Sequence, residues 1–205
     1  MPETQTAAAT GFQPLVVGLG GTTRENSSTE KVIRLVLNAA AEAGARIIQF
    51  SGPELAMPLY APENAERCEA AEKLVATLRM ADAVVIGSPG YHGGISGLVK
   101  NALDYTEDMA RDERVYFDGM PVGCVATGAG WQGANNTLSA LRAVTHSLRG
   151  WPTPLGIAVN SVEPVFGNDG TCINGGLEAQ AKMMAQQLLA FIRQEPSIVR
   201  HRSVA

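Results

Sequence analysis

The stretch that decides the fold runs from Val84 to Tyr105 and reads VVIGSPGYHGGISGLVKNALDY. Its apolar start, Val84–Ile86, is short enough for a fully buried strand. The following Gly87–Gly90 predicts a loop, because glycine and proline interrupt both strands and helices. Apolar residues then recur at helical spacing up to Leu103. This order is typical of a parallel α/β sheet, whose ligands bind at the carboxyl ends of the strands.

The predicted loop has a composition that suits a flat ligand. Three glycines would let such a ligand approach the backbone closely, namely Gly90, Gly93 and Gly94. Pro89 stiffens the segment, and Tyr91 and His92 offer ring surface and polar tips. A tight strand-to-helix connection without a ligand explains the same residues, so both interpretations stay open at this point.

Four further apolar runs predict strands, because each is bounded by turn-forming residues. They cover residues 15–19, 45–50, 121–126 and 154–159. Helical patterns follow these strands and end near residues 44, 80, 148 and 192, two of them starting near residues 65 and 134. Five strands that alternate with five helical patterns indicate a parallel sheet with helices on both faces.

A hydroxyl-rich loop follows the first predicted strand. Residues 20–29 read GGTTRENSST and carry one arginine, Arg24. Hydroxyls and free N–H groups at a helix start suit a phosphate, and Arg24 could add a charge-assisted bond. Simple helix capping by Ser27 or Ser28 explains the same residue types equally well. The segment has neither a Walker ending nor the dinucleotide fingerprint.

A third glycine-rich loop follows the fourth predicted strand. Residues 127–133 read TGAGWQG, and three glycines free the backbone to bond the edge of a planar heterocycle. Because all three loops leave the carboxyl ends of parallel strands, we expect them to converge on one rim of the sheet.

Two of these segments resemble a known family. Residues 88–105 are similar to the SPxYHGxxSGxLKNALD pattern of the NADPH-dependent FMN reductases, which are flavodoxin-like; Gly90 and Tyr105 replace the family's usual Glu and Trp. Residues 21–29 resemble the family's GSxRxxSxN phosphate loop, with matching positions at Thr22, Arg24, Ser27 and Thr29. The resemblance implies a flavodoxin-like three-layer sandwich with a five-stranded parallel sheet of order 2-1-3-4-5.

The resemblance also implies an FMN-dependent NAD(P)H oxidoreductase, in which the nicotinamide passes a hydride to the flavin. The FMN-binding residues would be Thr22, Arg24, Ser27, Ser28, Thr29, Ser88, Pro89, Gly90, Tyr91, His92, Gly93, Thr127, Gly128, Ala129 and Gly130. The 127–133 loop would meet the flavin pyrimidine ring with backbone N–H groups. No acid–base residue is required. Reduced flavin would go to a partner monooxygenase, or the enzyme would reduce a quinone, an azo dye or a metal oxyanion.

Other function classes fit less well. The segment around Ser88 lacks the G-x-S-x-G of a serine hydrolase. A metal site is not expected, because His92, His146 and His201 are isolated. The main alternative is a flavodoxin-like electron carrier without enzymatic activity. Such carriers tend to be strongly acidic and shield the ring with aromatics, whereas this chain has a net charge of −4 and glycine-rich loops.

Composition limits the remaining choices. With 205 residues, 45% hydrophobic and 18% charged, the chain suits one α/β domain. We expect a flexible leader (1–13), a single FMN-binding domain (14–195) and a tail (196–205). No basic stripe predicts nucleic-acid binding, and no apolar run approaches the ~20 residues of a membrane span. Scattered cysteines predict a cytoplasmic protein, and the Ala-rich 134–148 helix favours a homodimer or homotetramer.

Three segments carry further expectations. The charged residues of the second helix, Arg67 among them, are interpreted as a solvated face. Residues 107–118 are expected to form an exposed loop. The last helix should direct Met183, Leu188, Leu189 and Ile192 inward, and Cys124 should be buried.

Overall fold

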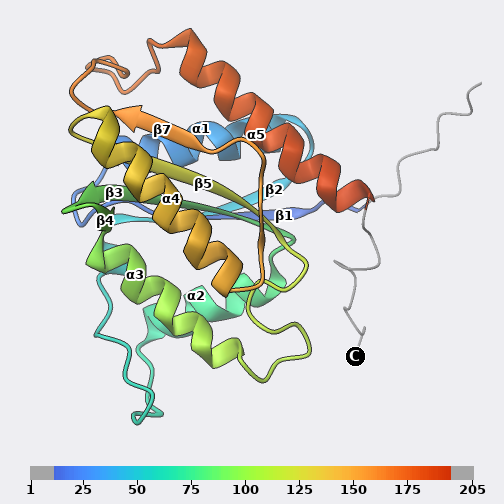
Figure 1. Cartoon of the computed structure of the whole chain (residues 1–205). Helices are drawn as coiled ribbons and strands as arrows, with labels where there is room; N and C mark the ends of the chain where they lie inside the picture. Colours follow the sequence, from blue (N-terminus) through green and yellow to red (C-terminus); the bar gives the residue numbers. More distant parts are fainter. Residues whose placement is uncertain (1–11, 195–205) are drawn as a thin grey trace, which may run out of the picture.

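A computed structural model describes residues 12–194 of the chain. It consists of a parallel sheet between two layers of helices (Figure 1). The strands are β1 (Leu15–Gly20), β2 (Arg46–Phe50), β3 (Ala83–Tyr91), β4 (Gly94–Ile95), β5 (Pro121–Gly128), β6 (Trp151–Pro152) and β7 (Ile157–Asn160). The helices are α1 (Ser28–Glu42), α2 (Glu69–Met80), α3 (Gly97–Asp104), α4 (Trp131–Ser147) and α5 (Gly175–Gln194), with short 3-10 turns at Gly52–Leu55 and Tyr105–Met109.

The strand order is β2-β1-β3-β5-β6, with β7 also paired to β5. β6 pairs with the start of β5 at Pro121, and β7 pairs with its end from Val125 to Gly128. These two short strands are therefore halves of one edge strand, and the predicted order 2-1-3-4-5 is confirmed. The strand predicted at 154–159 begins only at Ile157, and the edge strand is interrupted over residues 153–156, where Pro154 has no N–H for the ladder.

The prediction that the glycine–proline segment after Ile86 ends the strand is wrong. β3 continues to Tyr91, and its Gly87–Pro89 segment pairs with Val125–Thr127 of β5. Gly90 and Tyr91 then pair antiparallel with β4 across a two-residue turn. His92 (φ 51°) and Gly93 (φ 85°) both have positive φ, which is the signature of a type I′ hairpin turn. The backbone hydrogen bonds supplied by the neighbouring strand outweigh the local tendency of glycine and proline to end a strand.

Each face of the sheet carries its own hydrophobic core. Helices α1 and α5 pack on one face, and α2, α3 and α4 pack on the other (Figure 1). On α5, Leu188, Leu189 and Ile192 are buried as predicted, but Met183 is 51% exposed and Met184 is buried in its place. The helical period explains the correction, since position 184 lies one turn before Leu188 on the same stripe.

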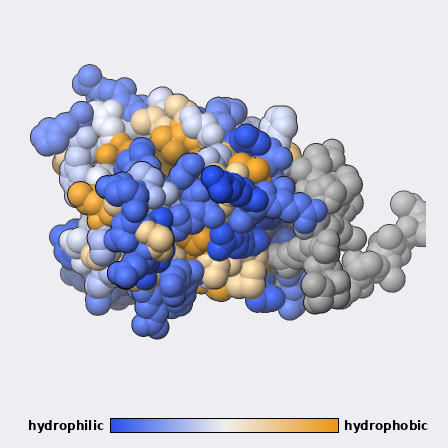
Figure 2. All heavy atoms as spheres, turned by 90° about the horizontal axis from the view of Figure 1, so that it is seen from below, coloured by the Kyte–Doolittle hydropathy of each residue, from blue (hydrophilic) through white to orange (hydrophobic). Residues whose placement is uncertain are grey.

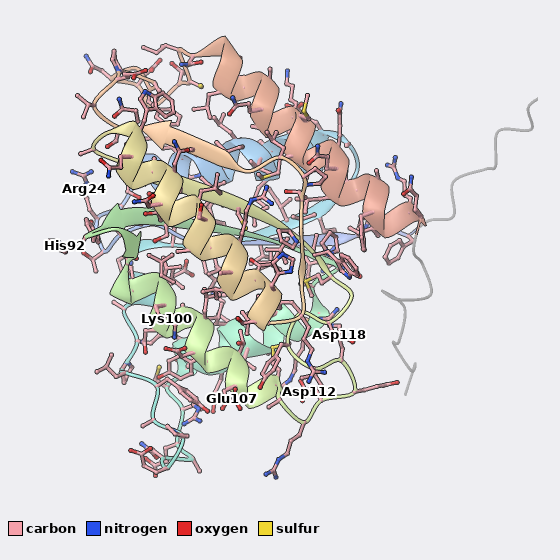
Figure 3. All side chains as sticks on the ribbon, viewed as in Figure 1. Arg24, His92, Lys100, Glu107, Asp112 and Asp118 are labelled. Atoms are coloured by element: carbon pink, nitrogen blue, oxygen red, sulfur yellow. The ribbon has the colours of Figure 1, made fainter. Side chains whose placement is uncertain are left out.

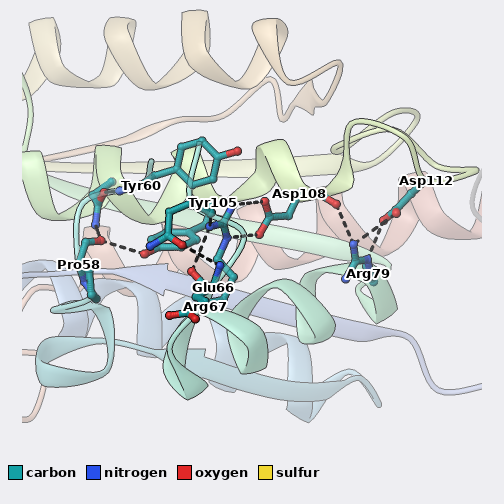
Figure 4. A network of polar contacts seen from close by, with 10 residues as sticks. Pro58, Tyr60, Glu66, Arg67, Arg79, Tyr105, Asp108 and Asp112 are labelled. Atoms are coloured by element: carbon teal, nitrogen blue, oxygen red, sulfur yellow. Dashed lines mark hydrogen bonds and ion pairs between the residues drawn. The ribbon is translucent and has the colours of Figure 1, made fainter. Parts of the chain in front are cut away.

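The segment before α2 and residues 107–118 are held by specific contacts that the sequence did not predict. Helix α2 begins at Glu69, so Arg67 precedes it and is not on a solvated helix face. The guanidinium binds Asp108 with both Nε (2.7 Å) and Nη2 (2.9 Å), as Figure 4 shows. This guanidinium holds the pKa of Asp108 below its usual range. The 107–118 segment is therefore not a simple exposed loop, and Met109 and Phe117 within it are fully buried.

The face of the molecule seen from below has a mixed surface (Figure 2). Seen from below, hydrophilic side chains dominate and apolar patches are scattered among them (Figure 2). Cys124 is buried as predicted, and burial raises the pKa of its thiol. No helix within residues 12–194 has the length and apolar character to cross a membrane. The predicted tail, nearly all of the predicted leader and His201 lie outside the described residues.

Candidate functional site

Three strand-end loops meet around one pocket of about 380 Å³ at the carboxyl edge of the sheet. Its lining residues are Thr22, Arg24, Ser27, Ser28, Thr29, Pro89, Gly90, Tyr91, Thr127, Gly128, Ala129 and Ser161. Eleven of the fifteen residues proposed from the sequence are among them. Figure 3 shows Arg24 and His92 at this same edge of the molecule.

The 20–29 loop ends in a capped helix. Ser27 is the N-cap of α1, and its Oγ accepts the Glu30 N–H at 3.3 Å, so the capping interpretation is confirmed. The cap uses an oxygen lone pair and leaves the Ser27 hydroxyl hydrogen free to donate. Thr22 Oγ1 accepts the Arg24 N–H and donates to the Arg24 carbonyl, both at 3.1 Å. The loop is thus folded by its own hydroxyls.

The charges around this loop favour an anion. Among the described residues, no partner binds the exposed Arg24 guanidinium. The nearby carboxylate of Glu30 is 5% exposed and engaged: it accepts the Asn26 N–H at 2.8 Å and forms an ion pair with Arg34. The first-turn amides of α1 add partial positive charge. The exposed Glu25 of the same loop does not line the pocket, and Arg24 is the one charged residue among the described lining residues. Because the buried acid is neutralised, the charge presented to the pocket is positive and suits a phosphate.

Two buried hydroxyls join the first loop to the third. Thr29 Oγ1 and Thr127 Oγ1 are 2.6 Å apart, and both side chains are almost fully buried. One hydroxyl donates to the other, so the pair retains one hydrogen that can be donated into the pocket. Beside them the backbones of β1 and β3 are in close contact, because a methyl group added at Gly20 would lie 1.9 Å from the Gly87 carbonyl oxygen.

The hairpin forms a second wall. Pro89, Gly90 and Tyr91 line the pocket, and the Tyr91 ring is half exposed. A methyl group added at Gly90 would lie 2.5 Å from Thr137 Oγ1, so this glycine is required by the packing of α4.

Three of the proposed residues lie away from this wall. Ser88 is buried behind it, where its hydroxyl donates to the Pro89 carbonyl (2.8 Å) and accepts the Ser96 N–H (2.9 Å). His92 and Gly93 form the exposed tip of the hairpin.

The 127–130 loop leaves the backbone N–H and carbonyl of Ala129 without a partner among the described residues. The Gly130 N–H donates to Asn160 Oδ1 and to the Gly128 carbonyl, each at 2.9 Å. That carbonyl also accepts the Ser161 N–H at 2.8 Å. Among the described residues, no partner binds the N–H or the carbonyl of Ala129, which lines the pocket. Gly130 is therefore the cap of α4, with φ 116°, and Ala129 is the group available to a ligand.

Asn160 and Ser161 were not proposed from the sequence. Ser161 lines the pocket, and Asn160 ties the 127–130 loop to the end of β7 through the Gly130 N–H and the Val162 N–H (3.3 Å). The sequence did contain a feature that could have identified them: both residues follow the last predicted apolar strand at its carboxyl end, where ligands bind in such sheets.

A doubly wound sheet of this order, with a hydroxyl-rich loop after its first strand and glycine-rich segments after its third and fourth, defines a flavodoxin-like protein. The sequence pattern of the NADPH-dependent FMN reductases matches residues 14–163, and the chain belongs to that family.

Individual relatives agree with this assignment. An FMN-dependent NADPH-azoreductase of Staphylococcus saprophyticus is 34% identical over 120 residues, which are 58% of this chain and 60% of the relative. The matched region is thus less than two thirds of the relative's length.

Solved structures share the fold. FerB, a flavoenzyme NAD(P)H:(acceptor) oxidoreductase from Paracoccus denitrificans, has a TM-score of 0.66 at 20% identity, covering 90% of this chain and 98% of FerB. An oxidoreductase from Corynebacterium diphtheriae has a TM-score of 0.66 at 19% identity, covering 89% and 98%. At these identities the structures establish the fold alone.

Proposed function

We propose that the protein is an FMN-dependent NAD(P)H oxidoreductase. The observation that carries the proposal is the division of one pocket into two chemically different ends. One end has an unpaired arginine, hydroxyls and a helix N-terminus, which suit a phosphate. The other end has the half-exposed Tyr91 and the unpaired backbone N–H and carbonyl of Ala129, which suit the edge of a planar ring. FMN likewise carries a phosphate at one end and a planar ring at the other. Membership of the family supports FMN as the ligand of this pocket.

The roles of the residues follow from these two ends. Arg24, Ser27 and Ser28 would hold the phosphate, and the Thr29–Thr127 pair would donate its spare hydrogen to the linking chain. The Ala129 N–H would face developing negative charge on the pyrimidine side. Bound there, FMN would supply hydride transfer at its N5 atom. The chain contributes binding and orientation, so no side chain is assigned as acid or base.

An electron donor and an electron acceptor are also proposed, with the best supported acceptor given first. A nicotinamide dinucleotide is the donor, and the protein-bound flavin passes electrons to an azo compound, as the name of the staphylococcal relative indicates for that protein. Reduction of a quinone or metal oxyanion, and release of reduced FMN to a monooxygenase, are the alternatives. A cytoplasmic homodimer or homotetramer remains part of the proposal; light scattering that shows only a 21.6 kDa monomer would exclude it.

An anaerobic assay tests the proposal. The protein is mixed with FMN and either NADH or NADPH, and the flavin absorbance and nicotinamide oxidation are followed before an azo dye, a quinone or a metal oxyanion is added. We expect flavin bleaching and catalytic nicotinamide oxidation. Failure with both nicotinamides, together with reduction by a separate reductase, would establish the electron-carrier alternative. Binding of FAD without binding of FMN would overturn the assignment of the cofactor.

A further inference from the structure

A second hollow, of about 110 Å³, adjoins the pocket described above. It lies between the end of β7 and the first turns of α4 and α5. Asn160 lines the hollow and the next residue, Ser161, lines the pocket. A ligand that extends out of the pocket along this turn therefore reaches the hollow directly.

The walls of the hollow suit a flat apolar ring. Val159, Val165 and Leu177 contribute buried side chains, and Trp131 at the first position of α4 is 51% exposed. A half-exposed indole beside an apolar floor can serve as a stacking platform for heterocyclic bases. At about 110 Å³ the hollow is smaller than the roughly 300–1,000 Å³ of a site for a drug-sized ligand. It accepts one ring system and not a whole dinucleotide.

Polar groups with unused capacity surround this slot. Glu163 Oε1 accepts the Asn160 Nδ2–H at 2.8 Å, which fixes the carboxylate and leaves its other oxygen open. Asn174 Oδ1 accepts the Leu177 N–H at 3.0 Å, so its amide hydrogens remain available. Within residues 12–194, no partner binds the Gln180 amide. The slot therefore offers an acceptor and several donors at its edge.

The charge of the hollow further limits which ligands can bind there. Glu163 is its one charged lining residue, and no lysine or arginine of the described chain lines it. A phosphate or pyrophosphate is therefore disfavoured, whereas a neutral base with an exocyclic amino group and ring nitrogens is well matched. Adenine has that pattern: its amino group can donate to Glu163, and its ring nitrogens can accept from Asn174 or Gln180.

We propose that this hollow binds the adenine ring of the nicotinamide dinucleotide and that Trp131 stacks on it. The proposal rests on the proposed function, because the nicotinamide end must lie in the neighbouring pocket. It adds an anchor for the part of the donor that takes no part in the reaction. Such remote binding positions the reacting end of a substrate.

The chain offers a direct reporter, because it contains only two tryptophans. Trp151 lies on β6, at the other end of β5 from the hollow, so Trp151→Phe leaves Trp131 as the single indole. This variant, without FMN, is titrated with ADP-ribose, which carries the adenine but no nicotinamide. We expect saturable quenching of the Trp131 emission. Ribose 5-phosphate with pyrophosphate, which lacks the base, should produce none.

Kinetics provide the second measurement. Trp131→Ala should raise KM for the dinucleotide about 5- to 150-fold, the range for losing one stacked base, and Trp131→Phe should restore most of it. The defect should disappear when reduced nicotinamide mononucleotide, which has no adenosine, is the donor. An equal defect with both donors would overturn the proposal.

The outcomes separate this proposal from the function it rests on. If FMN binds and the dinucleotide is oxidised but ADP-ribose does not quench Trp131, the adenine site is wrong and the oxidoreductase stands. If Trp131 is also shielded from acrylamide in that case, a second subunit covers the hollow. If FMN and dinucleotide turnover both fail while ADP-ribose quenches, the oxidoreductase is wrong and the base site stands.

Discussion

The 20–29 loop and the hairpin form two walls of the same pocket, but they are held by different forces. The loop is fixed by side chains: Ser27 caps α1, and the Glu30 carboxylate binds the Asn26 N–H. The hairpin is fixed by its backbone, through pairing with β5 and β4 and a type I′ turn. Single side-chain changes in the 20–29 loop should therefore alter the anion end selectively, whereas the hairpin wall should respond mainly to changes in its backbone.

The largest effect is expected where the two walls meet, at Gly20. Gly20→Ala places a methyl group 1.9 Å from the Gly87 carbonyl oxygen, at φ 141°. Clash and strain together should destabilise the fold by about 3 kcal/mol or more. Gly44→Ala is the matched control, since φ is 94° there and nothing lies within 4 Å; it should cost about 1–2 kcal/mol. Equal losses in urea unfolding would show that β1 and β3 are not in tight contact.

The next effect concerns the anion end. Arg24→Ala should weaken FMN by about 1.5–3 kcal/mol, the value of a charged hydrogen bond, and should leave riboflavin nearly unchanged. Arg24→Lys should be intermediate, because it keeps the charge and loses the planar fork. Fluorescence titration of both flavins measures this. Equal weakening of FMN and riboflavin would place Arg24 away from the phosphate.

A change at Asn160 should weaken both flavins without distinguishing between them. Asn160→Ala removes the acceptor of the Gly130 and Val162 N–H groups and so loosens the 127–130 loop. FMN and riboflavin should both weaken, by a similar amount of about 1–2 kcal/mol. The same titrations decide it: a loss confined to FMN would mean that this loop does not serve the ring end.

The smallest effect on stability is expected at the hairpin tip. Gly93 has φ 85° and open space around it, so Gly93→Val should cost about 1–2 kcal/mol of backbone strain alone. The turnover rate should fall markedly although the free energy of unfolding changes only by that amount, because the turn sets the position of Tyr91. Gly97→Ala, also in open space but without positive φ, serves as the control. Unchanged turnover in Gly93→Val would show that the conformation of the turn does not control the residues that line the pocket.

Features set by near neighbours in the chain were predictable from the sequence. The apolar runs predicted the strands, and the family resemblance implied their order in the sheet. The hydroxyl-rich 20–29 segment predicted a helix cap at Ser27 or Ser28, of which the structure uses Ser27. The motif resemblance placed eleven residues that the structure brings around one pocket. These features depend on periodicity, capping and turn chemistry, which act over a few residues.

Other features were decided only by the tertiary structure, because their partners are distant in sequence. β3 passes through Gly87–Gly90 as a strand because β5 and β4 pair with it there. Arg67 is bound because Asp108, 41 residues away, meets it. Asn160 acquires its role through Gly130, 30 residues before it. By itself the sequence determined which strands and loops form this pocket, and long-range packing decided which atoms remain free to bind a ligand.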